Sequence, residues 1–155
     1  IVVIHLPASQ KSLVAELLGT KCRVAVKEAE DKESIQAGTV YFAPPDYHLL
    51  IETNQLLSLS TEEPVHFSRP SVDVLFESAA DAYGPRLIGI ILTGSNDDGA
   101  AGLLSVQKQG GTAIVQSPDD ARAREMPRAA LRACPAARTM SLPEISAFLL
   151  EAAPR

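Results

Sequence analysis

LIGIILTGSNDDGAAG, residues 87–102, is the stretch of sequence that decides the fold. The apolar run at 87–92 predicts a buried strand, the glycine- and acid-rich residues after it predict a turn, and a helix is expected over about 98–109. A strand at 112–116 comes next, so this region predicts a βαβ unit that crosses over right-handedly onto a parallel sheet. Open α/β sheets build their sites at the carboxyl ends of such strands, which makes the carboxylates of this turn candidates for chemistry.

The region before this stretch has a different pattern. The elements expected before residue 34 are a short buried strand at Ile1–Ile4, a helix at Ser12–Leu18 closed by a left-handed Gly19, a strand at Arg23–Val26 and a solvated acidic loop at Glu28–Glu33. Apolar runs at 40–43, 48–52 and 56–60, separated by turn residues, predict antiparallel β-hairpins that interrupt the alternation of strand and helix.

Helices are expected in three further places. Apolar residues recur at helical spacing from Val72 to Tyr83, where Gly84 and Pro85 stop the helix. Pro127 opens a short helix, and Ser141 with Glu144 resembles a capping box ahead of a helical tail.

The composition fits one ordinary globular domain. The chain has 155 residues, 46% of them hydrophobic, which is enough for a core of its own. Its 14 basic and 19 acidic residues give a net charge of -5 without a basic cluster, so nucleic acid is not an expected partner. No apolar run reaches the length of a membrane span, and neither a signal peptide nor membrane insertion is expected. Cys22 and Cys134 look like reduced core residues of a cytoplasmic protein.

The chemistry is expected at His5 and the carboxylate turn, which follow two different apolar strands. If these strands are neighbours, both side chains reach the same rim of the sheet. A histidine held by a carboxylate acts as a general base toward a hydroxyl nucleophile, and the acid fixes the tautomer of the ring. The hydroxyl is missing from this pattern, because no G-x-S-x-G occurs and neither Ser9, Ser12 nor Ser95 stands on a strand-to-helix elbow.

Each candidate also has a plainer interpretation. A histidine at a strand end is often only a hydrogen-bonded structural group, and an aspartate at a helix start often only caps it, the role expected for Asp97. His48 and His66 are expected to be structural or peripheral, and Arg69 to anchor the loop before the helix that starts at Val72. Calcium and phosphate loops are disfavoured, since the turn lacks the alternating ligands of the first and the Lys-Ser/Thr pair of the second.

Six blocks of sequence together resemble the catalytic domain of the chemotaxis protein-glutamate methylesterases, the CheB family. They appear in family order at residues 1–10, 26–31, 41–44 with His48, 69–76, 91–102 and 126–128. The resemblance implies a three-layer α/β/α fold with a mostly parallel sheet and an antiparallel hairpin insertion. It also implies a cytoplasmic enzyme that hydrolyses glutamyl methyl esters on the cytoplasmic helices of chemoreceptors, releases methanol, and in many members deamidates receptor glutamines.

The family uses a Ser-His-Asp triad without a metal or an organic cofactor. His5 stands where the family's Gln-His-Met-Pro motif has its histidine, and Asp98 stands at the aspartate that precedes Gly99. The resemblance therefore implies that His5 and Asp98 are catalytic. Ser95 stands where a methionine N–H contributes to the oxyanion hole, a role that needs only main chain.

The chain departs from the family pattern in places that concern the site. The family's nucleophile lies in a Gly-Ala-Ser-Thr-Gly-Gly turn upstream of the histidine, so residues 1–155 are expected to be a methylesterase-like catalytic domain without its N-terminal strand and nucleophile turn. Ile4 replaces a glutamine, and Ser95 and Asn96 replace methionine and glycine; asparagine tolerates a positive φ better than most residues. A receiver domain, which typically regulates family members, is a second expected partner beside the receptor.

Two other functions stay open at this point. A protein that has lost its nucleophile would be a non-catalytic interaction module of a chemosensory assembly. A general hydrolase of small esters is the third interpretation. A Gly-x-Ser-x-Gly-Gly-like turn upstream of Ile1 would favour the enzyme over the module, and a comparison of simple acyl esters with methylated receptor would distinguish the general hydrolase.

Overall fold

The structure, a computed structural model, describes residues 1–5 and 12–152 of the chain. In chain order, its helices and strands are α1 (Val14–Gly19), β1 (Ala25–Glu28), β2 (Thr39–Phe42), β3 (His48–Ile51), β4 (Leu57–Ser60), α2 (Val72–Tyr83), the 3-10 helix η1 (Gly84–Arg86), β5 (Ile88–Ile91), α3 (Ala100–Lys108), β6 (Thr112–Gln116), α4 (Glu125–Ala133), β7 (Arg138–Met140) and α5 (Leu142–Ala152).

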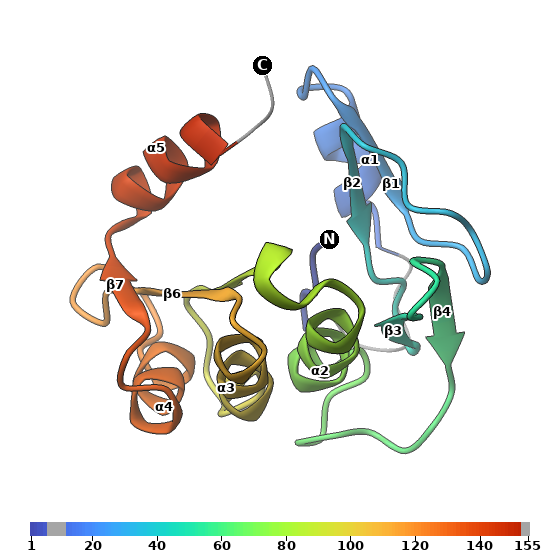
Figure 1. The fold of residues 1–155 in the computed structure, drawn as a ribbon. Helices are drawn as coiled ribbons and strands as arrows, with labels where there is room; N and C mark the ends of the chain where they lie inside the picture. Colours follow the sequence, from blue (N-terminus) through green and yellow to red (C-terminus); the bar gives the residue numbers. More distant parts are fainter. Residues whose placement is uncertain (6–11, 153–155) are drawn as a thin grey trace.

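The second half of the chain is built on a parallel sheet of β5, β6 and β7, in that order. The helices α3 and α4 lie on one side of this sheet and α5 lies on the other (Figure 1). The expected βαβ unit of β5, α3 and β6 is confirmed, and its parallel pairing sends the turn after β5 to the carboxyl edge of the sheet.

The first half of the chain holds two smaller sheets. β1 pairs with β2 in parallel, and β3 pairs with β4 as an antiparallel hairpin. The N-terminal segment runs beside β2, where the Val2 N–H donates to the Tyr41 carbonyl at 2.8 Å and the Val2 carbonyl accepts from the Ala43 N–H at 2.9 Å. Parallel sheets with helices on both sides and one antiparallel hairpin confirm the α/β fold class expected from the sequence.

Several local expectations are wrong. The segment Ile1–Ile4 is no buried strand: only Val2 forms a bridge, with Phe42, and the side chains of Ile1 and Ile4 are 42% and 38% exposed. β2 and β3 do not form a hairpin, because β2 pairs with β1 instead. Gly19 lies inside α1 without a positive φ.

Two further differences concern short or isolated features. Cys22 is exposed, so only Cys134 fits the expected core role. The strand β7 was not anticipated, because three residues, Arg138 to Met140, are too few to carry a periodic pattern.

The helix α2 joins the two halves of the core. Its Val72 packs in a cluster with Ile91, Leu103 and Val115 of the second half. Its Leu75 and Ala79 pack in a second cluster with core residues of β3 and β4, among them Leu49 and Leu57. The sequence placed this helix correctly, and its N-terminus is thereby held beside the turn that follows β5.

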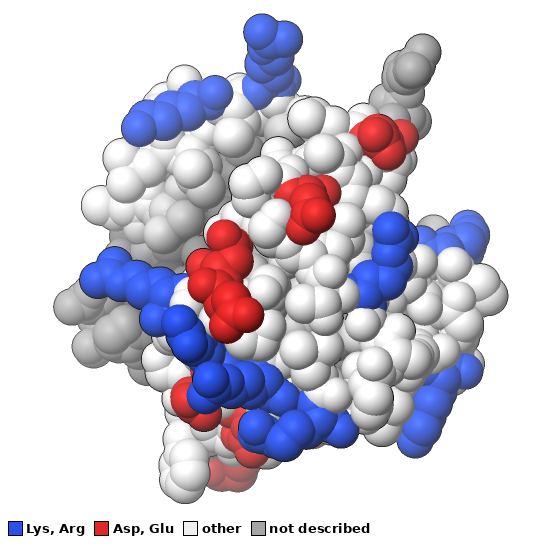
Figure 2. All heavy atoms as spheres, turned by 90° about the vertical axis from the view of Figure 1, so that its left-hand side faces the viewer, with Lys and Arg blue, Asp and Glu red and all other residues white. Residues whose placement is uncertain are grey.

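The side of the molecule that carries α4 and β7 bears a band of Lys and Arg side chains, with Asp and Glu beside it (Figure 2). In the described part of the chain, no helix has the length and apolar character needed to cross a membrane.

Gly102 lets α3 approach α2 closely. A Cβ at this position would lie 2.7 Å from the Phe76 Cβ, closer than Cβ atoms come in proteins, and 3.0 Å from the Asp73 Cα, which is tighter than most Cβ contacts. The approach also brings the Gly102 N–H to 2.6 Å from Asp73 Oδ1. The two helices could accept a side chain here only by moving apart.

We therefore expect Gly102→Ala to lower the free energy of unfolding by about 2 kcal/mol, because overpacking at a helix contact forces backbone shifts. Thermal or urea unfolding measures the change. Gly19→Ala is the matched control: it also lies in a helix, but its added Cβ would meet nothing closer than 3.7 Å. Equal destabilisation by the two substitutions would contradict the close-packing explanation.

Candidate active site

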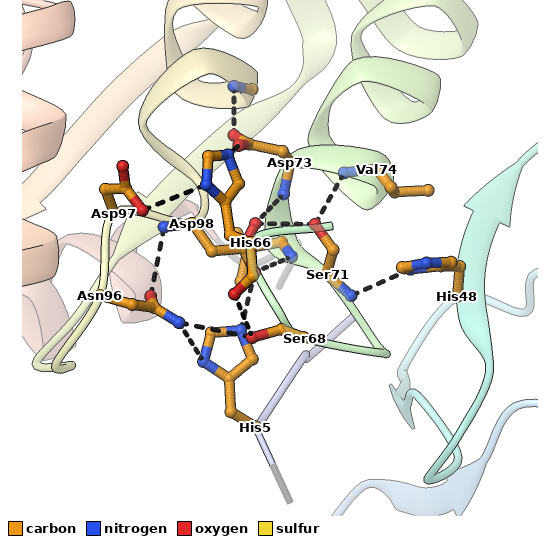
Figure 3. A network of polar contacts seen from close by, with 12 residues as sticks. His5, His48, His66, Ser68, Ser71, Asp73, Val74, Asn96, Asp97 and Asp98 are labelled. Atoms are coloured by element: carbon orange, nitrogen blue, oxygen red, sulfur yellow. Dashed lines mark hydrogen bonds and ion pairs between the residues drawn. The ribbon is translucent and has the colours of Figure 1, made fainter. Parts of the chain in front are cut away.

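The carboxylate of Asp98 accepts four hydrogen bonds in the protein interior (Figure 3). Its Oδ1 accepts from the Ser71 hydroxyl at 2.7 Å and from the Asp73 N–H at 3.0 Å. Its Oδ2 accepts from the Val72 N–H at 2.7 Å and contacts His5 Nε2 at 2.7 Å. Ser71, Val72 and Asp73 form the start of α2, so Asp98 caps the N-terminus of a helix other than the one that follows it.

Gly99 allows Asp98 to reach α2. It has a φ of 95°, and a Cβ there would lie 2.5 Å from Ile91 Cδ1 and 2.8 Å from Val72 Cγ1. A residue with a side chain would therefore clash with both β5 and α2, in a backbone conformation that favours glycine. Asn96, where the sequence raised the question of a positive φ, does not adopt one.

Two opposing influences set the pKa of Asp98. Burial favours the protonated acid and would raise the pKa, but the hydrogen bonds from His5, from the Asp73 and Val72 amides and from the Ser71 hydroxyl favour the carboxylate. The hydrogen bonds prevail, and the pKa of Asp98 lies below its ordinary value. Asp98 is therefore an anion at neutral pH despite its burial.

His5 lies just beyond the segment that pairs with β2, and its side chain is 28% exposed. Its two ring nitrogens have different surroundings. Nε2 contacts the buried Asp98, whereas Nδ1 lies 3.4 Å from Asn96 Nδ2 on the more exposed side. The structure thus brings together the histidine and the aspartate that are 93 residues apart in sequence. Their contact is compatible with a base and its orienting acid, and their catalytic roles stay a prediction.

Ser95 lies on the exposed side of the same turn. Two backbone hydrogen bonds of 3.1 Å fix the chain just before it, from the Gly94 N–H to the Ala123 carbonyl and from the Met126 N–H to the Gly94 carbonyl. Within the described residues the Ser95 N–H donates no hydrogen bond, so it is available to an incoming oxygen. Its assignment to an oxyanion hole also stays a prediction.

The remaining sequence candidates lie around this centre. Arg69 donates to Asp46 and to the carbonyls of Thr61 and Glu62, which confirms that it anchors a loop. His48 is buried, with Nδ1 accepting from the Ser71 N–H at 3.2 Å, and is structural as expected.

Asp97 does not cap α3, and that expectation is wrong. The N-cap of α3 is Gly99, and the Asp97 side chain, 64% exposed, instead lies 3.2 Å from His66 Nδ1. His66 Nε2 lies 3.3 Å from Asp73 Oδ2, so this histidine bridges two carboxylates, which fits a structural role, one of the two that were expected. Burial raises the pKa of Asp73, and the neighbouring Asp98 raises it as well, while the Gly102 N–H and His66 act against them.

Sequence reasoning missed Asn96, Ser71 and Asp73 as residues of this network. Ser71 could have been found as the N-cap of a well-defined helix, since Ser at that position is a strong signal. Asp73 carries no local signal, and the contacts of Asn96 with His5 and Ser68 join residues that are distant in sequence.

Comparison with known proteins gives one consistent family. A family model described as CheB methylesterase matches residues 1–149. A Leptospira interrogans protein, named for protein-glutamate methylesterase and protein-glutamine glutaminase activities, is 45% identical over 150 residues, which cover 97% of this chain and 78% of that protein. A protein-glutamate methylesterase/protein-glutamine glutaminase of Chromohalobacter salexigens is 41% identical, covering 96% of this chain and 43% of that protein. The crystal structure of the Thermotoga maritima CheB methylesterase catalytic domain superposes with a TM-score of 0.90 at 31% identity, covering 96% of this chain and 80% of that one.

The low pKa of Asp98 gives a pH-dependent prediction. Because the folded pKa lies below the unfolded one, the carboxylate stabilises the fold above about pH 4, and this stabilisation is lost as the pH falls through the folded value. Asp98→Asn replaces one acceptor oxygen by a donor and should lower the free energy of unfolding by about 2–3 kcal/mol at neutral pH.

The difference in the free energy of unfolding between the parent protein and Asp98→Asn should shrink as the pH is lowered, because the Asp98 carboxylate of the parent becomes protonated. Urea titrations at a series of pH values measure it, with Asp119→Asn, at an exposed position, as the control that should change little. A deficit that stays constant down to the acid limit would argue against a stabilising carboxylate.

Proposed function

Since the chain belongs to the CheB methylesterase family, we propose that it hydrolyses glutamyl methyl esters on chemoreceptors, releases methanol, and deamidates receptor glutamines at the same site. The observation that carries this proposal is the 2.7 Å contact between His5 Nε2 and the buried Asp98 carboxylate. A pair of this kind is what acyl transfer requires of a base and its orienting acid.

In this proposal, His5 is the general base and then the general acid. It accepts the proton of a hydroxyl nucleophile at Nδ1, because Nε2 faces Asp98. Asp98 holds the ring and stabilises the imidazolium, and the Ser95 N–H stabilises the oxyanion. The imidazolium then protonates the leaving methanol or ammonia, and water cleaves the acyl-enzyme by the same route.

The proposed nucleophile comes from outside the 155 residues. Within the described residues, no serine, threonine or cysteine side chain is in hydrogen-bond contact with His5. Ser71 is unsuited, because its hydroxyl is buried and donates to Asp98. The Leptospira interrogans relative extends beyond the matched region, which covers 78% of it.

An apolar groove supports one route by which a nucleophile reaches the site. The groove has a volume of about 520 Å³ and lies between the Val2 segment and β5, with Val3, Ile90 and Leu92 among its lining residues. In the described chain β5 pairs only with β6, and Val2 only with Phe42, so the edges that face the groove are unpaired. We propose that a preceding strand of the same polypeptide fills it and presents its hydroxyl at the rim, beside His5.

The proposed partners follow from the substrate. Methylated receptor glutamates lie on cytoplasmic helices among other acidic residues, so we place the reaction in the cytoplasm. Exposed Arg122 and Arg124 flank the Ala123 that pairs with the catalytic turn, and they would favour an acidic substrate. Control by a receiver domain is also proposed, from the family alone.

In the part of the chain that the structure describes, no hydroxyl is hydrogen-bonded to His5, and this observation favours one competing function. A polypeptide without a nucleophile would be a non-catalytic interaction module of a chemosensory assembly. The two functions differ in a direct measurement, the release of methanol.

The test uses the full natural polypeptide that contains this chain and membranes with methylated receptor. We expect methanol release, and we expect His5→Ala to lower its rate roughly a thousandfold or more, since removing one member of such a unit removes most of its effect. Arg138→Ala, at an exposed position, is the control. His48→Ala is unsuited as a control, because loss of a buried side chain would change the rate by destabilising the fold. Methanol release by His5→Ala at the parent rate would refute the proposed role, and equal turnover of simple acyl esters would favour a general esterase.

A further inference from the structure

Asn96 makes three polar contacts beside His5 (Figure 3). Its Oδ1 accepts a hydrogen bond from the Asp98 N–H at 3.2 Å. Its Nδ2 lies 3.4 Å from His5 Nδ1 and 3.4 Å from the Ser68 Oγ. Asn96 thus contacts one ring nitrogen of His5, and the buried carboxylate contacts the other.

The backbone contact fixes which way the Asn96 amide points. A backbone N–H can only donate, so the side-chain atom that faces the Asp98 N–H must be the oxygen. The NH₂ group therefore faces His5. An amide NH₂ has hydrogens to donate and no lone pair to offer, so Nδ1 of His5 must be the acceptor.

The tautomer of His5 follows from this assignment. A neutral imidazole carries one hydrogen, and if Nδ1 accepts, the hydrogen is on Nε2. Nε2 then donates to Asp98 Oδ2 at 2.7 Å, in agreement with an ionised carboxylate. Nδ1 keeps the basic lone pair, and Asn96 is hydrogen-bonded to it.

We propose that Asn96 is a positioning residue that holds His5 in the Nε2–H tautomer and occupies its basic nitrogen until a nucleophile displaces it. The inference rests on the proposed function only in naming that displacing group as a hydroxyl. The Asn96 amide and the nucleophile both donate a hydrogen bond to the lone pair of Nδ1, so they compete for it. Rotation of the Asn96 side chain releases the nitrogen by giving up the bond from the Asp98 N–H, while the backbone bonds of Gly94 and the side-chain bonds of Asp98 hold the turn on either side.

The test measures the reactivity of the His5 ring in the 155-residue chain. Diethyl pyrocarbonate transfers an ethoxycarbonyl group to an imidazole nitrogen that has a free lone pair, and peptide mass spectrometry reports the rate at each histidine. We expect Asn96→Ala to raise the rate at His5 about two- to fivefold, the size of one modest hydrogen bond. We expect Asn96→Asp to lower it, because a carboxylate beside Nδ1 favours a proton there and removes the lone pair.

The opposite signs separate positioning from a structural effect. A turn that is merely loosened would give both variants a change in the same direction. Asn54 provides a matched control, since its Oδ1 also accepts an N–H two residues ahead, from Leu56 at 3.2 Å. Asn54→Ala and Asn54→Asp should leave His5 unchanged, and buried His48 is the internal reference in every sample.

The outcomes are distinguishable from those of the methanol assay. Changes of the same sign in Asn96→Ala and Asn96→Asp, or no change beyond that of the Asn54 variants, would overturn the inference even in an active enzyme. Opposite signs would uphold the contact even if the full polypeptide released no methanol, in which case only the proposed hydrolysis would fail.

Discussion

The rest of the site depends on the buried carboxylate of Asp98, which lies at the N-terminus of α2 although Asp98 itself precedes α3. Asp98 follows β5, yet its hydrogen bonds go to the first residues of α2 and to His5 near the chain's beginning. Three segments distant in sequence are thereby fixed relative to one another. Because α2 also packs in both parts of the core, the position of the carboxylate is set by the whole fold rather than by the turn alone.

The electrostatic consequence is a charge that is buried and still stable. An isolated carboxylate in the interior would be protonated, since burial raises the pKa of an acid. Here the N–H groups at the start of α2, the Ser71 hydroxyl and His5 all point donors at Asp98, and the pKa falls instead. Asp73 is the contrasting case. It is also buried close to α3, but it has fewer donors and lies near Asp98, so its pKa rises. The two aspartates differ in their donors, which local sequence does not reveal.

Sequence reasoning could predict the elements whose signals are local. The strand at β5, the helix α2 and the βαβ unit follow from periodicity and from turn residues within a few positions. Pairing between β1 and β2 could not be read in this way, because the turn at Pro44 is equally compatible with a hairpin, and only distant contacts decide which edge β2 joins. The contact of His5 with Asp98 was anticipated from the resemblance to a family. Those of Asn96 and His66 were not, because the partners of these side chains are set by tertiary structure.

The choice of a neutral amide on the open side of His5 has a physical reason. A cation at the position of Asn96 would disfavour a proton on the ring and so weaken it as a base, and a carboxylate would draw a proton onto Nδ1 and remove the lone pair. An amide donor orients the ring and brings no charge to it. A neutral hydrogen bond of 3.4 Å is also weak enough to be exchanged for one from a hydroxyl. The His5 ring therefore has a short contact at Nε2, with the Asp98 carboxylate that stabilises the imidazolium, and a long one at Nδ1, the nitrogen that receives the proton.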